Sequence, residues 1–343
     1  MALPAAIPEP RPLAPAPSLR WGVVGPGGIA DRFVTALGRH GSQQVVAIGS
    51  RSLDRAEAFA AKHGVEHFAG SYAELVDHHE VDVVYIATPH DSHRALAELA
   101  LEAGKHVVVE KPIATTASDA AAIVDLARAR GLLAMEAMWT HYLPQADVLR
   151  QLLERGAIGE VTHVAVDFGF SAPYDPEHRL FNPAVGGGAL LDAGVYPVSF
   201  AVSVLGEPRA VHAAGTLAAT GVDDHAQLTL SFDGALASAT TSLRSALPVR
   251  AVLSGTAGRI EIAPPYIAPS TLVLSTTAIW ASDDAVSWTD DALSDTYDAL
   301  HYEADAAARF ISEGRVESPV HGHAATVAVI NVLEQARRQL GAV

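Results

Sequence analysis

The stretch that decides the fold is Trp21-Gly22-Val23-Val24-Gly25-Pro26-Gly27-Gly28-Ile29-Ala30. Its apolar start predicts a strand that leads directly into a glycine-rich turn, and a helix is expected from about Ile29 to Arg39. Gly25 allows the turn, Gly27 lets the backbone approach a pyrophosphate, and the small Ala30 lets the helix pack close to the strand. An ordinary glycine turn also satisfies this pattern, so the elements that follow it along the chain are needed to identify a dinucleotide-binding turn. The candidates to bind phosphate at this helix start are Gly25, Gly27, Gly28, Ile29 and Ala30.

The end of the second predicted strand, Gln44 to Ser50, indicates which dinucleotide binds. An acidic residue at this point would bind the ribose 2′-hydroxyl and repel a 2′-phosphate. The sequence instead has Ser50-Arg51-Ser52, which offers a cation and two hydroxyls. We therefore predict NADP(H) over NAD(H), with a preference on the order of tenfold to a hundredfold. The alternative is a solvated arginine in a loop.

Strands and helices keep alternating after this point. Helices are expected at residues 53–63, 72–76 and 92–103, and strands at 81–87 and 106–110. This alternation predicts a doubly wound parallel sheet with a ligand crevice beyond the carboxyl ends of its strands. Four loops converge on that edge, and they contain Gly25, Arg51, the run Thr88, Pro89 and His90, and the run Glu110, Lys111 and Pro112.

Lys111 follows the fifth strand directly, where its side chain would face a bound nicotinamide. Pro112 restricts the backbone of the lysine and indicates a fixed turn, although a surface lysine at a strand end is the alternative. A second pair, Asp192 and Tyr196, lies four residues apart in an apolar segment that suits a buried helix, so both would share one face. A phenol has a pKa of about 10 and exchanges protons at neutral pH only beside a cation, which Lys111 can supply.

These motifs resemble the glucose-fructose oxidoreductase/inositol dehydrogenase family. The resemblance rests on residues 25–30, Ala87-Thr88-Pro89, Glu110-Lys111-Pro112 and the glycine-rich run 186–196, and it extends over about residues 19–340. Within the family, residues 136–144 are similar to the branch that contains dihydrodiol dehydrogenases and NADP-dependent pentose or hexose dehydrogenases.

The resemblance implies a hydride transfer between the nicotinamide and a CH–OH group of a sugar, polyol or cyclic diol. Tyr196 would take the hydroxyl proton, Lys111 would hold the oxygen and polarise the tyrosine, and Asp192 would orient the sugar hydroxyls or the lysine. The family often has histidine where Tyr196 stands, so Lys111 or Tyr196 is the direct proton acceptor. A cis Lys111–Pro112 bond and a homodimer or homotetramer are also implied.

The second half of the chain has a different pattern. Strand-like runs at 161–170, 210–215, 226–232, 235–243, 250–255, 258–262 and 271–276 predict a largely antiparallel sheet with one open face, with helices at 144–154, 188–205, 297–313 and 324–340. We expect an α+β domain at residues 140–343, a Rossmann domain at 19–139 and an Ala/Pro-rich tail at 1–18. The tail is most simply disordered, with an arm on a neighbouring subunit as the alternative.

The amino-acid composition limits the classes of molecule that the chain is expected to bind. The chain has 39 acidic and 23 basic residues and a formal charge of −16, which would repel nucleic acid and anionic membranes and suits a small neutral substrate. Zero cysteines exclude disulfides and a cysteine nucleophile. The apolar run 187–206 contains a proline and a charge, so a buried core helix is expected instead of a membrane span. The N-terminus has no signal-peptide pattern, which predicts a cytoplasmic enzyme.

The sixteen histidines do not predict a metal site, because the close pairs 78/79, 90/93 and 321/323 are expected on helix surfaces or loops. His90 is the exception, since it follows Thr88-Pro89 at the ligand edge. Weaker candidates for the wall that faces the substrate are Trp139, Tyr142, Tyr174, Asp175, His178 and Arg179.

Two functions of different classes fit these patterns. One is an oxidoreductase, either an aldose dehydrogenase or a trans-dihydrodiol or inositol-type dehydrogenase. The other is a redox sensor that binds NADP(H) without turnover. The presence of Lys111, Asp192 and Tyr196 together favours the enzyme, because a sensor has no need for a proton relay.

Overall fold

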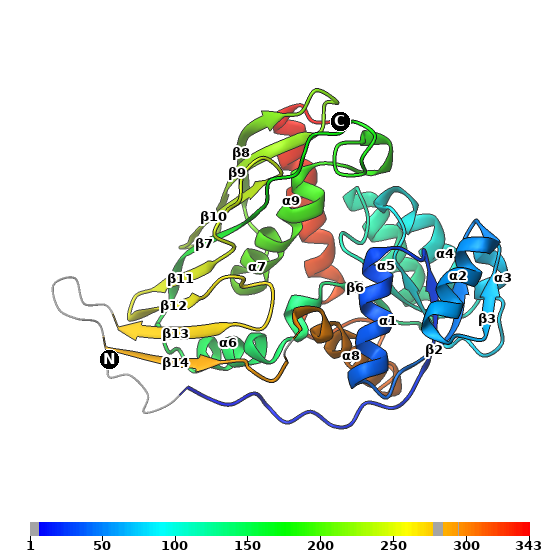
Figure 1. Ribbon diagram of the computed structural model, residues 1–343. Helices are drawn as coiled ribbons and strands as arrows, with labels where there is room; N and C mark the ends of the chain where they lie inside the picture. The colour runs from blue at the N-terminus through cyan, green and yellow to red at the C-terminus, as the bar shows by residue number, and fades with distance from the viewer. Residues whose placement is uncertain (1–6, 277–283, 294) are drawn as a thin grey trace. The chain divides into compact units, whose positions relative to one another are not determined.

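The computed structural model describes residues 7–276, 284–293 and 295–343 (Figure 1). The chain forms two compact units. The first, called here the parallel-sheet unit, contains residues 13–139 and 295–327. The second, called the mixed-sheet unit, contains residues 1–12, 140–294 and 328–343. Helix α9 (His323–Leu340) begins in the first unit and ends in the second.

The parallel-sheet unit has a six-stranded sheet in the order β3-β2-β1-β4-β5-β6, and every pair in it is parallel. The order runs outward in both directions from β1 and β4, which is the switch point of a doubly wound sheet. The predicted Rossmann fold is therefore confirmed. The strands are β1 (Arg20–Val24), β2 (Gln44–Gly49), β3 (His67–Ala69), β4 (Val83–Ile86), β5 (His106–Glu110) and β6 (Ala134–Ala137).

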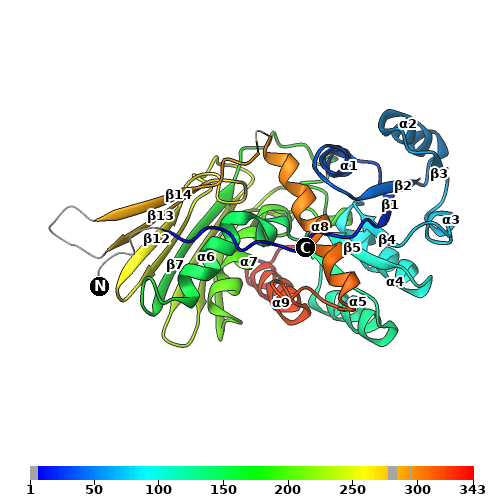
Figure 2. The same ribbon diagram turned by 90° about the horizontal axis from the view of Figure 1, so that it is seen from below.

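Helices cover both faces of this sheet, with α1 and α8 on one face and α4 and α5 on the other (Figure 2). The sequence patterns missed α5, β3 and β6. Residues 117–130 of α5 are rich in alanine, so they show no clear apolar stripe, and the two strands have only three and four residues. The helical elements are α1 (Gly28–His40), α2 (Leu53–His63), α3 (Tyr72–Val76), η1 (His90–Ser92), α4 (His93–Glu102), α5 (Ala117–Arg130), η5 (Thr296–Ala299) and α8 (Leu300–Ser312).

The core of this unit is built on an aromatic stack. Phe33 of α1 stacks on Tyr85 of β4 with ring centroids 3.9 Å apart, and Trp21 of β1 packs edge-on against Phe33 at 5.4 Å. All three side chains are fully buried. The indole N–H of Trp21 donates to Gln43 Oε1 at 3.1 Å. Because β4 is buried along its whole length, it has the continuous apolar sequence expected of a parallel strand covered on both faces.

The mixed-sheet unit has an eight-stranded sheet in the order β14-β13-β12-β11-β7-β10-β9-β8. Only the pair β7 and β10 is parallel among the pairs of described strands, so the predicted, largely antiparallel sheet is confirmed. The strands are β7 (Val161–Gly169), β8 (Ala210–Leu217), β9 (Asp223–Ser231), β10 (Leu236–Ser242), β11 (Ala251–Gly255), β12 (Gly258–Ile262), β13 (Thr271–Thr276) and β14 (Ala285–Thr289). The sequence patterns missed β14, an edge strand without a fully buried residue.

The helices of this unit lie on one face of the sheet (Figure 1). The segment Pro183–Leu205 is long and apolar enough to cross a membrane, but 78% of its most apolar window is buried within the protein. Its last part, α7, packs against β7 and β10, as expected of a core helix. The helical elements are η2 (Trp139–Tyr142), α6 (Pro144–Glu154), η3 (Pro183–Val185), η4 (Leu190–Gly194), α7 (Val195–Leu205) and the C-terminal part of α9.

The described part of the N-terminal tail has partners on α6, although disorder was the simplest expectation for residues 1–18; residues 1–6 lie outside the described residues. Residues 7–12 run along α6 in the same unit (Figure 2). The backbone N–H of Arg11 donates to Asp147 Oδ2 at 2.7 Å, and the Gln151 side chain donates to the Glu9 carbonyl at 2.8 Å. The side chain of Ile7 is buried. Polar groups on α6 thus satisfy the extended backbone, which composition alone could not show.

Asp223 of β9 anchors the segment that leads into α7. Its side chain is fully buried, and Oδ2 accepts a hydrogen bond from the backbone N–H of Leu190 at 2.6 Å. Gly188 has a φ of +121°, and a Cβ there would lie 2.6 Å from Asp223 Oδ1. Burial raises the pKa of Asp223 to about 6, and the hydrogen bond from Leu190 only partly offsets that effect.

The titration of Asp223 predicts a pH-dependent stability. The folded protein keeps the Asp223 proton up to about pH 6, whereas the unfolded chain loses it near 3.8, so stability falls as pH rises between these values and is constant above them. Asp223→Asn removes this titration and keeps an acceptor oxygen. Urea unfolding of both proteins from pH 4 to 8 should show a difference that grows by up to about 3 kcal/mol up to pH 6. Asp233→Asn, at an exposed ion pair, is the control. Parallel curves for Asp223→Asn and the unmodified protein would contradict the assignment.

Candidate active site

The glycine turn after β1 has a backbone that only glycine fits. Gly25 has a φ of +87°, and a Cβ there would lie 2.7 Å from Thr88 Cγ2 and 2.8 Å from the Ala87 carbonyl oxygen. The backbone N–H of Gly27 donates to the Gly25 carbonyl at 2.8 Å and closes the turn. The turn therefore lies directly against the Thr88 loop at the end of β4.

The start of α1 is open for an anion. Gly27 is the N-cap residue and provides no side-chain cap, and a Cβ at Gly28 would have no neighbour within 4 Å. The first-turn N–H groups near Ile29 are therefore not covered by a capping side chain. Ala30 is fully buried, as the helix–strand packing requires. This geometry fits a pyrophosphate, whose charge would interact with the positive end of the helix.

The loop after β2 and the first turn of α2 carry one arginine each, Arg51 and Arg55. Ser50 accepts a hydrogen bond from the Ser52 N–H at 3.2 Å, and Ser52 caps α2 by accepting from the Arg55 N–H at 3.4 Å, so both hydroxyls shape the loop. Arg51 is exposed and has no hydrogen bond or ion pair to any residue within the described ranges. Arg55 extends across to the glycine turn, with Nη2 3.5 Å from the Pro26 carbonyl oxygen. Sequence analysis missed Arg55, although its place in the first turn of α2 was a usable signal.

His93 connects two of the converging loops. It is fully buried, and its ring nitrogens lie 2.9 Å from the carbonyl oxygens of Thr88 and of Pro112. Burial lowers the pKa of His93, so its ring is neutral and donates to only one of these carbonyls at a time. The expectation that this histidine lies on a helix surface is wrong. His90 packs its ring against His93 at 5.7 Å and belongs to the same loop.

A side chain of β6, Glu136, holds the turn that contains Lys111. Glu136 is almost fully buried, and its Oε1 accepts a hydrogen bond from the Ile113 N–H at 2.8 Å. Its Oε2 accepts from His321 Nε2 at 2.8 Å, and His323 Nε2 donates to the Ala134 carbonyl at 3.0 Å. The His321/His323 pair is thus buried, which corrects the surface expectation. The Lys111–Pro112 bond is cis, as the resemblance implied.

Two buried carboxyl groups of the parallel-sheet unit, Glu110 and Glu303, influence each other's charge. Glu110 accepts hydrogen bonds from the Tyr85 hydroxyl and the Lys111 N–H, and burial raises its pKa while the Lys111 charge opposes that rise. Glu303 of α8 is fully buried, and neither oxygen has a hydrogen-bond partner in the described part of the chain. Burial, and then the Glu110 charge, raise the pKa of Glu303 well above its ordinary value.

The mixed-sheet unit holds the other catalytic candidates. Asp192 is buried, and its Oδ1 lies 2.7 Å from Arg179 Nη1 in an ion pair. Tyr196 is largely buried and packs edge-on against Phe168 at 5.2 Å. Residues 190–194 form a π-helical turn, so the expected continuous α-helix is wrong there, and the spacing of four does not place the two side chains as an α-helix would. Thr241 donates to the Ala189 carbonyl at the start of this turn, an insertion of the kind that disturbs a helical ladder.

The weaker substrate candidates do not form one group. Trp139 stacks on Tyr297 within the parallel-sheet unit, whereas Tyr142 belongs to the mixed-sheet unit. Tyr174 is half-exposed and packs on Phe181, and His178 accepts from the Leu180 N–H within the same loop. Arg179 is joined to a proposed catalytic residue, Asp192, by an ion pair. Asp175 accepts from the Glu177 N–H and shapes the loop.

A doubly wound sheet with this turn and these strand ends is the binding unit of a dinucleotide-dependent oxidoreductase. Two family models match the chain. One, described as an oxidoreductase family with an NAD-binding Rossmann fold, matches residues 19–138, and the GFO/IDH/MocA C-terminal domain matches residues 147–261. The chain belongs to the GFO/IDH/MocA oxidoreductase family, as the resemblance indicated.

Relatives cover nearly the whole chain. The trans-1,2-dihydrobenzene-1,2-diol dehydrogenases of Mus musculus and Homo sapiens are 36% and 35% identical to it, over 94% of this chain and 97% of theirs. The 3-ketoreductase KijD10 of Actinomadura kijaniata, solved with NADP and TDP-benzene, is 28% identical with a TM-score of 0.80, over 94% of this chain and 98% of that one. Levoglucosan dehydrogenase, at 21% identity and a TM-score of 0.85 over 94% and 97%, shares the fold.

The position of His93 predicts that it fixes the loops at the strand ends. His93→Phe keeps a buried ring but removes the hydrogen bond that holds Thr88 or Pro112. The free energy of unfolding should fall by about 1–3 kcal/mol, and turnover should fall by about tenfold to a hundredfold because the Lys111 turn shifts. Urea unfolding and steady-state rates measure both effects. The control is His63→Phe, whose ring bonds Asp31 away from these loops. Equal rates for the two variants would count against the assignment.

Proposed function

We propose that this oxidoreductase uses NADP(H) and transfers hydride between the nicotinamide and a CH–OH group of a sugar, polyol or cyclic diol. The observation that carries the proposal is the Lys111 turn, which Glu136 and His93 hold beside the glycine turn and the Thr88 loop at one edge of the sheet. A lysine turn held at this edge supports a role for Lys111 in binding a substrate oxygen next to a bound dinucleotide. Similarity to named trans-dihydrodiol dehydrogenases, at 33–36% identity, supports a cyclic diol or related substrate.

The proposed division of roles gives each residue one task. When bound, the nicotinamide accepts or supplies the hydride at C4. The Lys111 ammonium donates a hydrogen bond to the substrate oxygen and stabilises negative charge as it develops there. Tyr196 takes the hydroxyl proton in the oxidation direction. In the alternative, Lys111 takes the proton instead, which requires its neutral amine form. Asp192, held by Arg179, orients the neighbouring hydroxyls of the substrate.

Lys111 belongs to the parallel-sheet unit, whereas Asp192 and Tyr196 belong to the mixed-sheet unit. The solved structures of KijD10 include a lysine-to-alanine variant and a tyrosine-to-phenylalanine variant, both with NADP and TDP-benzene. A lysine and a tyrosine were thus the residues replaced in a relative with the same fold. The proposal extends that pair of residue types to Lys111 and Tyr196.

The preference for NADP rests on two cations. Arg51 is exposed at the end of β2, and Arg55 lies across from Pro26 of the glycine turn. A 2′-phosphate bound in this corner would meet one or both guanidinium groups, and the loop has no carboxylate at the usual ribose position. The NADP complex of KijD10, at 28% identity, is consistent with this choice.

The open face of the mixed sheet supports a homodimer or homotetramer. Leu236 of β10, which alternates with the buried Ala237 and Ala239, is 49% exposed although it is large and apolar. Cover by another copy of the chain would remove it from water. The cytoplasmic location and the domain boundaries at residues 18 and 139 stay predictions from the sequence.

A substrate panel tests the proposed function directly. Purified protein with NADP⁺ is assayed against aldoses, inositols and trans-dihydrodiols by the absorbance of NADPH, and turnover with at least one class is expected. Lys111→Met and Tyr196→Phe should each lower that turnover by about a hundredfold or more, the scale of lost acid–base assistance, while NADPH still binds.

Lys62→Met, at an exposed ion pair on α2, and Tyr72→Phe, on α3, are the matched controls and should keep full activity. An active Tyr196→Phe enzyme would assign the proton transfer to Lys111 or water, and unchanged Lys111→Met would remove the lysine from the mechanism. Bound NADPH with no turnover across the panel would favour the redox sensor.

The cofactor choice is tested separately through the ribose corner. Arg51→Ala should raise the KM for NADP by about tenfold to a hundredfold and leave the KM for NAD nearly unchanged, because only the 2′-phosphate loses a charged hydrogen bond. Arg55→Ala should shift the same ratio in the same direction. Arg130→Ala, at the exposed C-terminal end of α5, is the control. Equal effects of Arg51→Ala on both cofactors would refute the phosphate assignment.

A further inference from the structure

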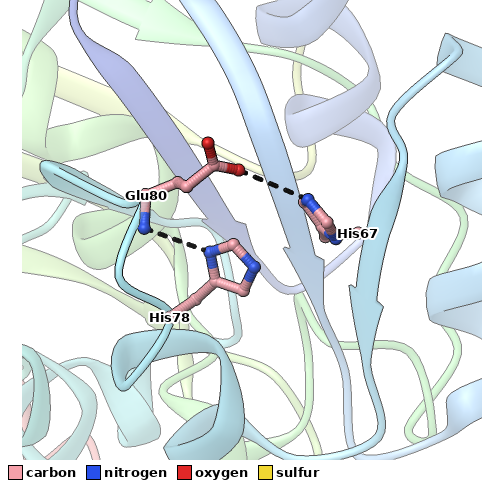
Figure 3. Close-up of side chains that lie close together, drawn as sticks. All are labelled: His67, His78 and Glu80. Atoms are coloured by element: carbon pink, nitrogen blue, oxygen red, sulfur yellow. Dashed lines mark hydrogen bonds and ion pairs between the residues drawn. The ribbon is translucent and has the colours of Figure 1, made fainter.

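Three polar side chains meet at the opposite end of the parallel sheet. His67 begins β3, and His78 and Glu80 lie in the turn between α3 and β4. Figure 3 shows the Glu80 carboxylate directed toward the His67 ring and the His78 ring turned toward the Glu80 backbone N–H. Because strands β3 and β4 are parallel and begin here, this end is the amino edge of the sheet, away from the carboxyl edge that binds the dinucleotide.

The distances between the three groups suit a small cation. His67 Nε2 lies 3.3 Å from Glu80 Oε2, and one ligand atom from each residue lies within 4.8 Å of the other two. Tetrahedral zinc with bonds of about 2.0–2.1 Å separates its ligand atoms by about 3.3 Å. The His67–Glu80 pair already has that separation. His78 has to approach by about 1.5 Å at most, which a side-chain rotation can supply.

His78 would lose only one weak hydrogen bond on binding a cation. Its Nδ1 accepts a hydrogen bond from the Glu80 backbone N–H at 3.3 Å, which is long and therefore weak. If Nδ1 binds the ion, it no longer accepts this bond, and if Nε2 binds, Nδ1 carries the proton and again cannot accept. The bond is lost either way. Its weakness keeps the cost small compared with a metal–nitrogen bond.

The backbone around the cluster is held in place. Lys105 Nζ donates to the carbonyls of His78 and Val81 at 3.1 and 2.8 Å, which fixes the turn that carries two of the three side chains. Its positive charge opposes a bound cation, so moderate affinity is expected. The nearby Arg20 is paired with Asp82 at 2.7 Å. His67 and Glu80 are about 40% exposed, which leaves the space open to solvent ions.

We propose that His67, His78 and Glu80 form a binding site for a zinc-type divalent cation that joins the edge strand β3 to the turn before β4. Two imidazoles and one carboxylate are a common zinc ligand set, with water in the fourth position. The same ligands favour Ni²⁺ and Cu²⁺, whereas Mg²⁺ and Ca²⁺ prefer all-oxygen sites. Its place at the amino edge gives the site a structural role, separate from hydride transfer.

The test starts from full-length protein treated with a chelator and then dialysed. Calorimetric titration with Zn²⁺ should show one ion per chain at this site, and millimolar Mg²⁺ should not compete. His67→Ala, His78→Ala and Glu80→Gln should each weaken Zn²⁺ binding by about tenfold to a hundredfold or more. Co²⁺ in place of Zn²⁺ should give the visible absorption of a four-coordinate ion, and the variants should lose it.

Two controls separate this site from ordinary surface histidines. His63→Ala removes an imidazole that bonds Asp31 and packs on Phe59, and His79→Ala removes the ring that stacks beside His78 at 5.2 Å. Both should bind Zn²⁺ like the unmodified protein. Zn²⁺ should also raise the melting temperature of the unmodified protein and of both controls, but not of His67→Ala.

The proposal is overturned if Zn²⁺ affinity is the same in the unmodified protein and in all three ligand variants. It is also overturned if His79→Ala abolishes binding while His67→Ala does not. Glu80→Gln is nearly isosteric, so it tests the site even if a histidine variant unfolds. Circular dichroism of each variant before titration establishes that it is folded.

Discussion

The candidate active site depends on one buried carboxylate, Glu136. Its two oxygens accept hydrogen bonds from the Ile113 N–H and from His321, so it joins the turn after Lys111 to the segment before α9. A buried N–H without a partner costs about 1–3 kcal/mol, and a buried carboxylate without donors costs more. Both penalties disappear only when the turn has this conformation. The turn that carries the lysine is therefore held by buried polar groups of the protein itself. His93 holds the same turn a second time, because its ring nitrogens contact the carbonyl oxygens of Pro112 and Thr88.

Much of the fold was predictable because its signals are local. The alternating pattern of residues 258–262 and 271–276 gave β12 and β13, and the helical period with a leading proline gave α6, with the observed bounds in all three cases. The glycine turn was predictable because a φ of +87° beside Thr88 leaves no choice of residue. Elements without local signals were missed: β3 and β6 are short, and α5 is too rich in alanine to show an apolar stripe.

The groups that tune the site could not be predicted, because each acts through a residue distant in the sequence. His93 reaches Pro112, Glu136 meets His321, and Glu303 affects Glu110 across nearly 200 positions. A histidine or glutamate in a helical pattern usually faces solvent, and only tertiary packing shows otherwise. The π-helical turn before α7 is a similar case, since the contact between Thr241 and the Ala189 carbonyl lies between segments 52 residues apart.

The placement of charge follows from these contacts. Glu110 precedes Lys111 in the chain, and burial raises its pKa while the Lys111 charge opposes that rise. Glu303 is buried, neither of its carboxyl oxygens has a hydrogen-bond partner in the described part of the chain, and burial followed by the Glu110 charge raises its pKa well above the ordinary value. Two ionised carboxylates in this buried region would repel each other, so the charge of Glu110 favours the neutral form of Glu303. The carboxyl group of Glu303 costs folding stability, because no hydrogen bond among the described residues offsets its burial.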